Sequence, residues 1–326
     1  MNFSQFIKEI GRGAQGARDL EEEDAHRLFA AILDGGVPDL ELGAIVLAMR
    51  VKTESVSELL GFHRALNERQ VRLRAPSGEV RPVVIPTYNG ARHQANLLPL
   101  IVLLLKRIGV PVLVHGCLDG NGRVASAYVF RELGIFPCST ASQAQRALDT
   151  EGMAFVPTAV LSPGLASLLS LRARLGVRNS GHTLVKLMDP FGGDGLRMCS
   201  VSHPAYLEKL AGFLLQSNAH GLLMRATEGE AFANPKRRPQ IVRYEEGEAN
   251  VLFEAELGPI RSLPGLPDSI EPVPTAAWIR RVMGGELPLP HPLANQLACC
   301  LYASGYTQDM HQAKAIAAVE AGSLVA

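Results

Sequence analysis

Val83-Val84-Ile85-Pro86-Thr87-Tyr88-Asn89-Gly90-Ala91-Arg92 begins as a run of apolar residues and ends as a polar turn that contains one glycine. The β-branched run from Val83 to Ile85 is typical of a buried strand, and Gly90 favours a turn after it. Residues 96–108 are predicted to form a helix, and residues 112–114 a second strand. Apolar strands that alternate with helices indicate a mainly parallel sheet covered by helices.

The same alternation continues toward the carboxyl terminus. Further strands are predicted at residues 195–201, 221–225, 241–243 and 249–253, with helices at 126–133, 204–216, 275–283, 294–304 and 308–320. Prolines from Pro264 to Pro274 predict an exposed loop before the last three helices. We therefore expect an α/β domain with a mostly parallel sheet that spans residues 71–326.

Three amphipathic helices precede this domain. Asp19 is predicted to cap the first helix, and Ser55, with Glu58 in the following turn, to cap the third. Helices this short need one another, or a partner chain, to bury their apolar faces. We expect a small helical domain at residues 1–70, completed by a helix within residues 163–185.

Composition excludes several classes of protein. The 32 basic side chains equal the 32 acidic ones, so the field of the whole molecule does not attract nucleic acid, and any such binding needs a local patch. The longest apolar run, residues 97–105, is about half the ~20 residues that cross a membrane. Five cysteines without a C-x-x-C pair are typical of reduced thiols. We expect a cytoplasmic protein with no membrane partner.

The loop after the first predicted strand is a candidate binding site, because open α/β sheets bind ligands beyond the carboxyl ends of their strands. One glycine is too few for a loop that holds phosphate with several backbone amides. The predicted anion or substrate pocket comprises Tyr88, Asn89, Gly90, Arg92, His115, Gly116, Arg123 and Arg172. No carboxylate or nucleophile lies at motif distance from His115, so we assign no catalytic residue.

The order of these elements resembles the anthranilate phosphoribosyltransferase and nucleoside phosphorylase superfamily over nearly the whole chain. The matching words are Val114-His115-Gly116-Cys117, Asn121-Gly122-Arg123, Leu133-Gly134 and Arg172 ahead of Leu175-Gly176-Val177-Arg178. The resemblance implies a small helical domain joined to a larger α/β domain. It also implies that Arg172 matches the arginine that contacts the anthranilate carboxylate in the enzymes.

The chain departs from these enzymes where they bind pyrophosphate and metal. Their glycine-rich Gly-Thr-Gly-Gly-Asp word is replaced by Thr87-Tyr88-Asn89-Gly90, and Val114 stands in place of a lysine. Their Asp-Glu pair for magnesium is replaced by Thr227-Glu228-Gly229-Glu230, in which only Glu230 matches. We therefore expect no cofactor, and magnesium at Glu230 only if the chain is an enzyme.

Residues 86–92, 94–97 and 227–235 are similar to a divergent bacterial branch, the anthranilate-phosphoribosyltransferase-like DNA-binding proteins. This resemblance implies a homodimer formed through the helical domain that binds DNA with little sequence preference.

The consecutive cations Lys236, Arg237 and Arg238 lie between two prolines and are therefore predicted to form a loop. With Arg243, they are the candidate nucleic-acid-binding residues, since loops of this kind contact phosphates. A solvated surface loop without a partner is the alternative interpretation. Pairing of these cations with Glu245, Glu246 or Glu248 would argue against DNA.

Two hypotheses follow. The leading one is a dimer that binds DNA without sequence preference on a phosphoribosyltransferase-like scaffold. The alternative is a glycosyltransferase that acts on a phosphorylated sugar and a small aromatic or base acceptor. That alternative requires Arg92, Arg123 and Arg172 to converge on one cleft, and it loses its basis if they point apart.

Overall fold

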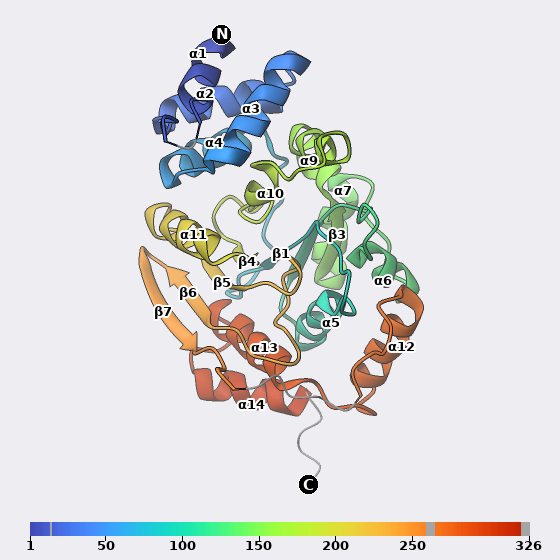
Figure 1. The fold of residues 1–326 in the computed structure, drawn as a ribbon. Helices are drawn as coiled ribbons and strands as arrows, with labels where there is room; N and C mark the ends of the chain where they lie inside the picture. The colour runs from blue at the N-terminus through green and yellow to red at the C-terminus, as the bar shows by residue number, and fades with distance from the viewer. Residues whose placement is uncertain (14, 259–264, 321–326) are drawn as a thin grey trace. The chain divides into compact units, whose positions relative to one another are not determined.

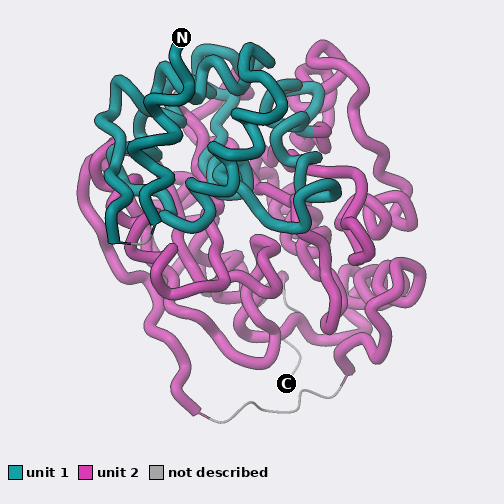
Figure 2. The backbone as a smooth tube through the Cα atoms, turned by 45° about the horizontal axis from the view of Figure 1, so that its top comes forward, with its two compact units in different colours: residues 1–72, 158–192 teal, residues 73–157, 193–326 magenta. Residues whose placement is uncertain are grey.

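A computed structural model describes residues 1–13, 15–258 and 265–320 (Figure 1). The chain forms two compact units, one of residues 1–72 and 158–192 and the other of residues 73–157 and 193–326 (Figure 2). The first unit is helical, and the second has helices around a mostly parallel sheet. The predicted fold class, a small amino-terminal helical domain with a larger α/β domain, is confirmed.

The helical unit is formed by α1 (Phe3–Ile10), α2 (Glu22–Leu33), α3 (Asp39–Lys52), α4 (Val56–Arg69), α8 (Thr158–Leu161), α9 (Pro163–Leu175) and α10 (Gly181–Leu184). The predicted opening helices correspond to α2, α3 and α4, while α1 was not predicted. The predicted cap at Asp19 was wrong, because α2 begins at Glu22 and the Asp19 carboxylate instead pairs with the Lys52 ammonium group.

Ser55 caps α4 as predicted, and its partner Glu58 has a larger role. The Ser55 hydroxyl accepts the Glu58 N–H at 3.1 Å, and the Glu58 carboxylate accepts the Ser55 N–H at 2.8 Å. The fully buried carboxylate also accepts the Leu20 N–H at 2.9 Å and pairs with Lys52 at 2.7 Å. Glu58 therefore ties the start of α4 to the end of α3 and to the segment before α2.

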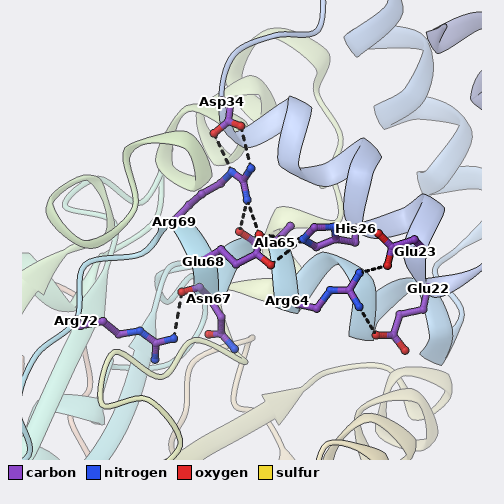
Figure 3. A network of polar contacts seen from close by, with 10 residues as sticks. All are labelled: Glu22, Glu23, His26, Asp34, Arg64, Ala65, Asn67, Glu68, Arg69 and Arg72. Atoms are coloured by element: carbon purple, nitrogen blue, oxygen red, sulfur yellow. Dashed lines mark hydrogen bonds and ion pairs between the residues drawn. The ribbon is translucent and has the colours of Figure 1, made fainter. Parts of the chain in front are cut away.

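The helices α2 and α4 pack tightly against each other. Phe29 and Phe62 stack with ring centroids 4.5 Å apart, and a Cβ added to Gly61 would lie 2.3 Å from the Glu22 carbonyl oxygen. The absence of a side chain at Gly61 therefore permits this close approach. Polar contacts connect α4 with α2 and with Asp34, the residue after α2 (Figure 3). Arg64 pairs with Glu22 and Glu23, the His26 ring contacts Glu68, and Arg69 pairs with Asp34.

The α/β unit contains the strands β1 (Val83–Thr87), β2 (Val112–Gly116), β3 (Met153–Pro157), β4 (Leu196–Val201), β5 (Gly221–Arg225), β6 (Ile241–Glu245) and β7 (Glu248–Phe253). Its helices are α5 (Leu98–Ile108), α6 (Ser126–Glu132), α7 (Ala141–Glu151), α11 (Pro204–Gln216), α12 (Pro272–Met283), α13 (His291–Ala303) and α14 (Met310–Glu320). The helix α7 and the strand β3 were not predicted from the sequence. Pro264, in the predicted proline-rich loop, lies outside the described residues.

The sheet has the order β3-β2-β1-β4-β5-β6-β7, with β1 to β5 parallel and β6 and β7 antiparallel. The chain adds strands on one side of β1 first and then, from β4 onward, on the other. The carboxyl ends of β1 and β4 therefore mark the topological switch point, where open α/β sheets bind ligands.

Helices cover both faces of this sheet. Ile85 and Met198 point into the large apolar core that includes α5, α12 and α13. The helix α11 contacts β4 and β5, and its buried Phe213 is not part of that core. It therefore packs on the opposite face. No helix in the described parts of the chain has both the length and the apolar character needed to cross a membrane.

Candidate functional site

The carboxylate of Glu230, after β5, lies among hydrogen-bond donors at the carboxyl end of β1. Glu230 is fully buried. Its Oε1 accepts the backbone N–H groups of Asn89 at 2.8 Å and Gly90 at 2.7 Å. Its Oε2 accepts the Thr87 hydroxyl at 2.6 Å and the Ser126 hydroxyl at 3.3 Å. The Glu230 carboxylate thus accepts hydrogen bonds from the two backbone amides at the start of this loop.

A second carboxylate binds the next part of the same loop. Glu228 accepts the His93 N–H at 2.9 Å and the Arg92 N–H at 2.5 Å. The Asn89 side-chain amide donates to the Glu228 carbonyl oxygen. The loops after β1 and β5 are therefore joined by acidic side chains that accept from backbone amides.

These contacts decide whether Glu230 fits a magnesium ion. Magnesium needs near-octahedral oxygen ligands with accessible lone pairs. Both Glu230 oxygens accept two hydrogen bonds, and the Glu228 carboxylate of the same motif accepts the backbone N–H groups of Arg92 and His93. The residues present do not fit the metal in this arrangement.

The other predicted pocket residues divide between the two units. Tyr88 and His115 are buried, and Arg123 lies beside the loop after β1, because Ala91 pairs with Val124 in an isolated β-bridge. Arg92 is exposed. Arg172 lies on α9 in the helical unit. The structure therefore brings the α/β residues to one edge of the sheet, while the convergence of Arg172 with them stays a prediction.

Gly116 has a packing role that its sequence position did not reveal. A Cβ at this residue would lie 1.5 Å from the Thr87 carbonyl oxygen, closer than any two such atoms approach. Glycine is therefore required at position 116, because Gly116 pairs with Thr87 at the ends of β2 and β1.

Cations gather around His182 in the helical unit. Burial lowers the pKa of His182 to about 3, and the nearby charges of Arg178, Arg172 and Lys186 contribute to this shift. His182 is therefore neutral near pH 7, and it accepts the Asn179 N–H through Nδ1 at 3.2 Å. The predicted Arg172 belongs to this group of positive charges.

The basic loop keeps part of its charge available. Lys236 and Arg237 are exposed. Arg237 donates from Nε to the Glu256 carbonyl oxygen at 2.7 Å, and Arg238 donates from Nε to the Glu254 carbonyl oxygen at 3.0 Å. Arg238 also lies 4.0 Å from the Glu256 carboxylate. Within the described residues, none of these three cations pairs with Glu245, Glu246 or Glu248.

Arg243 differs from these three cations. Its guanidinium group pairs with the Glu245 carboxylate and lies 4.9 Å from the centroid of the Tyr302 ring. Arg243 therefore has partners within the protein. It lies on β6 and not in the basic loop with Lys236, Arg237 and Arg238, with which it was predicted to bind nucleic acid.

Sequence reasoning missed a groove of about 610 Å³ in the α/β unit, between α11, β5, β6 and the basic loop. Its charged lining residues are Glu208, Arg225, Glu228, Arg237, Arg238 and Glu256. Arg225 is the exposed last residue of the otherwise buried strand β5, and this change from apolar to charged residues is visible in the sequence. The groove itself depends on the position of α11, which no local pattern specifies.

Comparison with known proteins defines the class to which this fold and site belong. Residues 4–69 match the glycosyl transferase family, helical bundle domain. Anthranilate phosphoribosyltransferase of Thermus thermophilus is 27% identical over 91% of this chain and 90% of its own. A crystal structure of the enzyme from this species matches with a TM-score of 0.78 at 25% identity, covering 99% of this chain and 95% of that one. The class is a phosphoribosyltransferase-like glycosyltransferase scaffold.

Within this class, one relative shows the family. Uncharacterized protein YbiB of Escherichia coli K12 is 45% identical over 306 residues, which cover 94% of this chain and 95% of that protein. The chain belongs to the family of YbiB, within the anthranilate phosphoribosyltransferase and family 3 glycosyltransferase superfamily.

Replacement of Glu230 tests whether its carboxylate holds the two loops together. Glu230→Ala leaves two buried amides and two hydroxyls without this acceptor, so we expect the free energy of unfolding to fall by about 2–5 kcal/mol. Glu230→Gln keeps one acceptor oxygen and should lose about half as much. Urea unfolding measures both, with Glu248→Ala on exposed β7 as the control. A loss for Glu230→Ala no larger than that of the control contradicts this role.

The low pKa of His182 predicts sensitivity to acid. The unfolded chain takes up a proton near pH 6.5 while the folded chain does not until about pH 3, so stability is lost as the pH falls through this window. The loss reaches about 5 kcal/mol at the lower end. Urea unfolding from pH 7 to pH 4 measures the free energy of unfolding at each pH. His182→Gln should make this free energy depend less on pH, whereas the control His93→Gln, at an exposed residue, should not. Parallel curves for His182→Gln and wild type would contradict the assignment.

Proposed function

We propose that this protein binds the phosphate backbone of DNA, with little sequence preference, through the basic loop and groove of its α/β unit. The observation that supports this most directly is the grouping of Arg225, Arg237 and Lys236. Arg225 and Arg237 line one groove, and Lys236 adjoins it in the loop. Within the described residues, neither Arg225 nor Lys236 has a side-chain ion pair. Cations without a carboxylate partner attract phosphates. Contacts to phosphates do not depend on the base sequence.

The contacts of Glu230 and Glu228 with the β1 loop support a protein that binds DNA and does not transfer a phosphoribosyl group. A pyrophosphate group would have to displace Glu230 from Asn89 and Gly90, and to do so next to Glu228. Two carboxylates next to a polyanion repel it. The crevice that serves as the substrate site in a transferase is therefore poorly suited to one here.

A transferase that acts on a phosphorylated sugar is the second candidate. The comparisons favour it more than they favour DNA, because the relatives named for an activity are anthranilate phosphoribosyltransferases. Calorimetric titration with inorganic pyrophosphate, with and without magnesium, tests it. Tight binding of pyrophosphate by the wild-type protein would support the transferase. No binding would support a β1 loop whose amides are occupied by Glu228 and Glu230.

We place this function in the cytoplasm. The five cysteines, all within the described residues, form no disulfide. Burial raises the pKa of Cys300 to about 12, so this thiol stays protonated. Buried thiols of this kind are typical of proteins in a reducing compartment.

We also propose that the helical unit forms a homodimer. Leu40, Leu47 and Val51 lie on one side of α3 and are 83%, 53% and 61% exposed. Apolar side chains on the exposed side of a helix can pack against the same side of α3 in a second copy of the chain. A dimer presents two basic loops, which increases affinity for a long polyanion.

A salt titration tests DNA binding. Binding of a random-sequence duplex should weaken steeply with salt, and Lys236→Ala/Arg237→Ala/Arg238→Ala should weaken it and make the slope shallower by about 2–3. Fluorescence anisotropy measures both quantities. The control Lys106→Ala/Arg131→Ala/Arg281→Ala removes three cations elsewhere in the α/β unit. Absence of binding by the wild type at low salt would exclude this function.

Sedimentation velocity tests the dimer. Leu47→Asp introduces a charge into the exposed apolar side of α3, so we expect it to convert the dimer to a monomer at micromolar concentration. Phe136→Asp, at an apolar residue of the α/β unit that is 68% exposed, is the matched control and should remain dimeric. A monomeric wild type would exclude the homodimer.

A further inference from the structure

The chain contains two asparagine–glycine pairs, Asn89-Gly90 and Asn121-Gly122. Such a pair is chemically labile, because glycine has no side chain to hinder attack of its backbone nitrogen on the carboxamide carbon of the preceding asparagine. The attack expels ammonia and converts the asparagine to aspartate or isoaspartate. Whether each pair reacts therefore depends on how the folded chain holds these two groups.

The first pair is held by buried contacts. Asn89 is fully buried, and its side-chain amide donates to the Glu228 carbonyl oxygen. The Gly90 N–H donates to the Glu230 carboxylate at 2.7 Å. A Cβ added to Gly229 would lie 2.7 Å from Nδ2 of Asn89, so the carboxamide has little room to turn. The nitrogen and the carboxamide that would react are therefore both engaged.

The second pair lies in the loop between β2 and α6, and both of its residues are exposed. Asn121 and Gly122 have φ angles of +49° and +80°, and a Cβ added to Gly122 would meet no atom within 4 Å. The Asn121 backbone N–H donates to the Asp119 carboxylate at 3.0 Å. Among the described residues, neither the Asn121 side chain nor the Gly122 N–H makes a hydrogen bond. Both reacting groups are therefore free.

We propose that Asn121 is a site of spontaneous deamidation and that the fold protects Asn89 from the same reaction. The Gly122 nitrogen forms a bond to Cγ of Asn121 and loses its proton, while the bond from Cγ to the amide nitrogen breaks and ammonia leaves. A succinimide ring remains. Water then opens this ring at either carbonyl carbon, which gives aspartate or isoaspartate. Water is the one co-reactant, and the reaction is independent of any bound ligand.

The reaction changes the loop that contains Arg123, a residue of the predicted anion pocket. Either product adds a negative charge two residues before Arg123 and close to the Asp119 carboxylate. Neighbouring like charges repel each other, and the new charge lowers the positive potential around Arg123. Isoaspartate also adds a carbon to the backbone, just before the bridge between Ala91 and Val124 that joins this loop to the β1 loop.

Peptide mapping by mass spectrometry tests the proposal. The wild-type protein is incubated at mildly alkaline pH, either folded or unfolded in guanidinium chloride, and the products at both asparagines are followed with time. In the folded protein, we expect deamidation at Asn121 to be at least about tenfold faster than at Asn89, because Asn89 reacts only after its buried hydrogen bonds open. In the unfolded chain the two rates should be similar.

Isoelectric focusing provides a second measurement on the intact protein. An acidic species should accumulate with time in the wild type and should be lost in Asn121→Gln, because glutamine would have to form a larger ring and reacts far more slowly. The control Asn250→Gln, at an exposed asparagine that precedes Val251, should still form the acidic species.

Two outcomes would overturn the proposal. One is a folded protein in which Asn121 stays intact over a period in which the unfolded chain reacts, since this would mean that the loop is protected. The other is deamidation at Asn89 as fast as at Asn121 in the folded protein, since this would mean that the contacts of Gly90 and Asn89 give no protection.

Discussion

The buried carboxylate of Glu230 is the contact on which the candidate site depends. It joins the loop after β5 to the amides of Asn89 and Gly90 and to the hydroxyls of Thr87 and Ser126. A buried carboxylate is stable only where donors satisfy it, so these donors and Glu230 require one another. The same contact occupies the backbone amides of Asn89 and Gly90 at the switch point of the sheet. One carboxylate therefore joins the two loops and also engages the amides of the β1 loop.

The scaffold and the groups at the candidate site provide separate evidence about function. The sheet order and the helical unit are those of a phosphoribosyltransferase-like glycosyltransferase, and the chain is a member of the YbiB family. Fold alone does not fix activity, because activity depends on the groups at the site. Here Arg225 and Arg237 lie along the groove beside α11, whereas the β1 loop holds the exposed Arg92 beside the carboxylates of Glu228 and Glu230. A neutral chain can in this way still present a local surface for a polyanion.

Local sequence predicted most elements, and the errors have physical reasons. Ser55 and Glu58 signalled the start of α4 because a capping box is formed by residues three apart. Asp19 carries the same kind of signal, yet its carboxylate binds Lys52, which is distant in sequence. The short strand β3 and the helix α7 before it carry weak patterns, and pairing of β3 with β2 stabilises the strand. The close approach of Gly116 to the Thr87 carbonyl oxygen was not visible in the sequence, and the assignment of Gly116 to a pocket stays a prediction.

The amino-acid order alone specified most of the strands and helices and the altered pyrophosphate and magnesium words, because these depend on residues a few positions apart. The partners of the charged groups depended on the folded chain. Glu230 meets Asn89, which lies 141 residues earlier, and Arg237 and Arg225 line a groove whose wall is α11. Hydrogen bonds and clefts form between segments that folding brings together, and a linear pattern contains no distance between such segments.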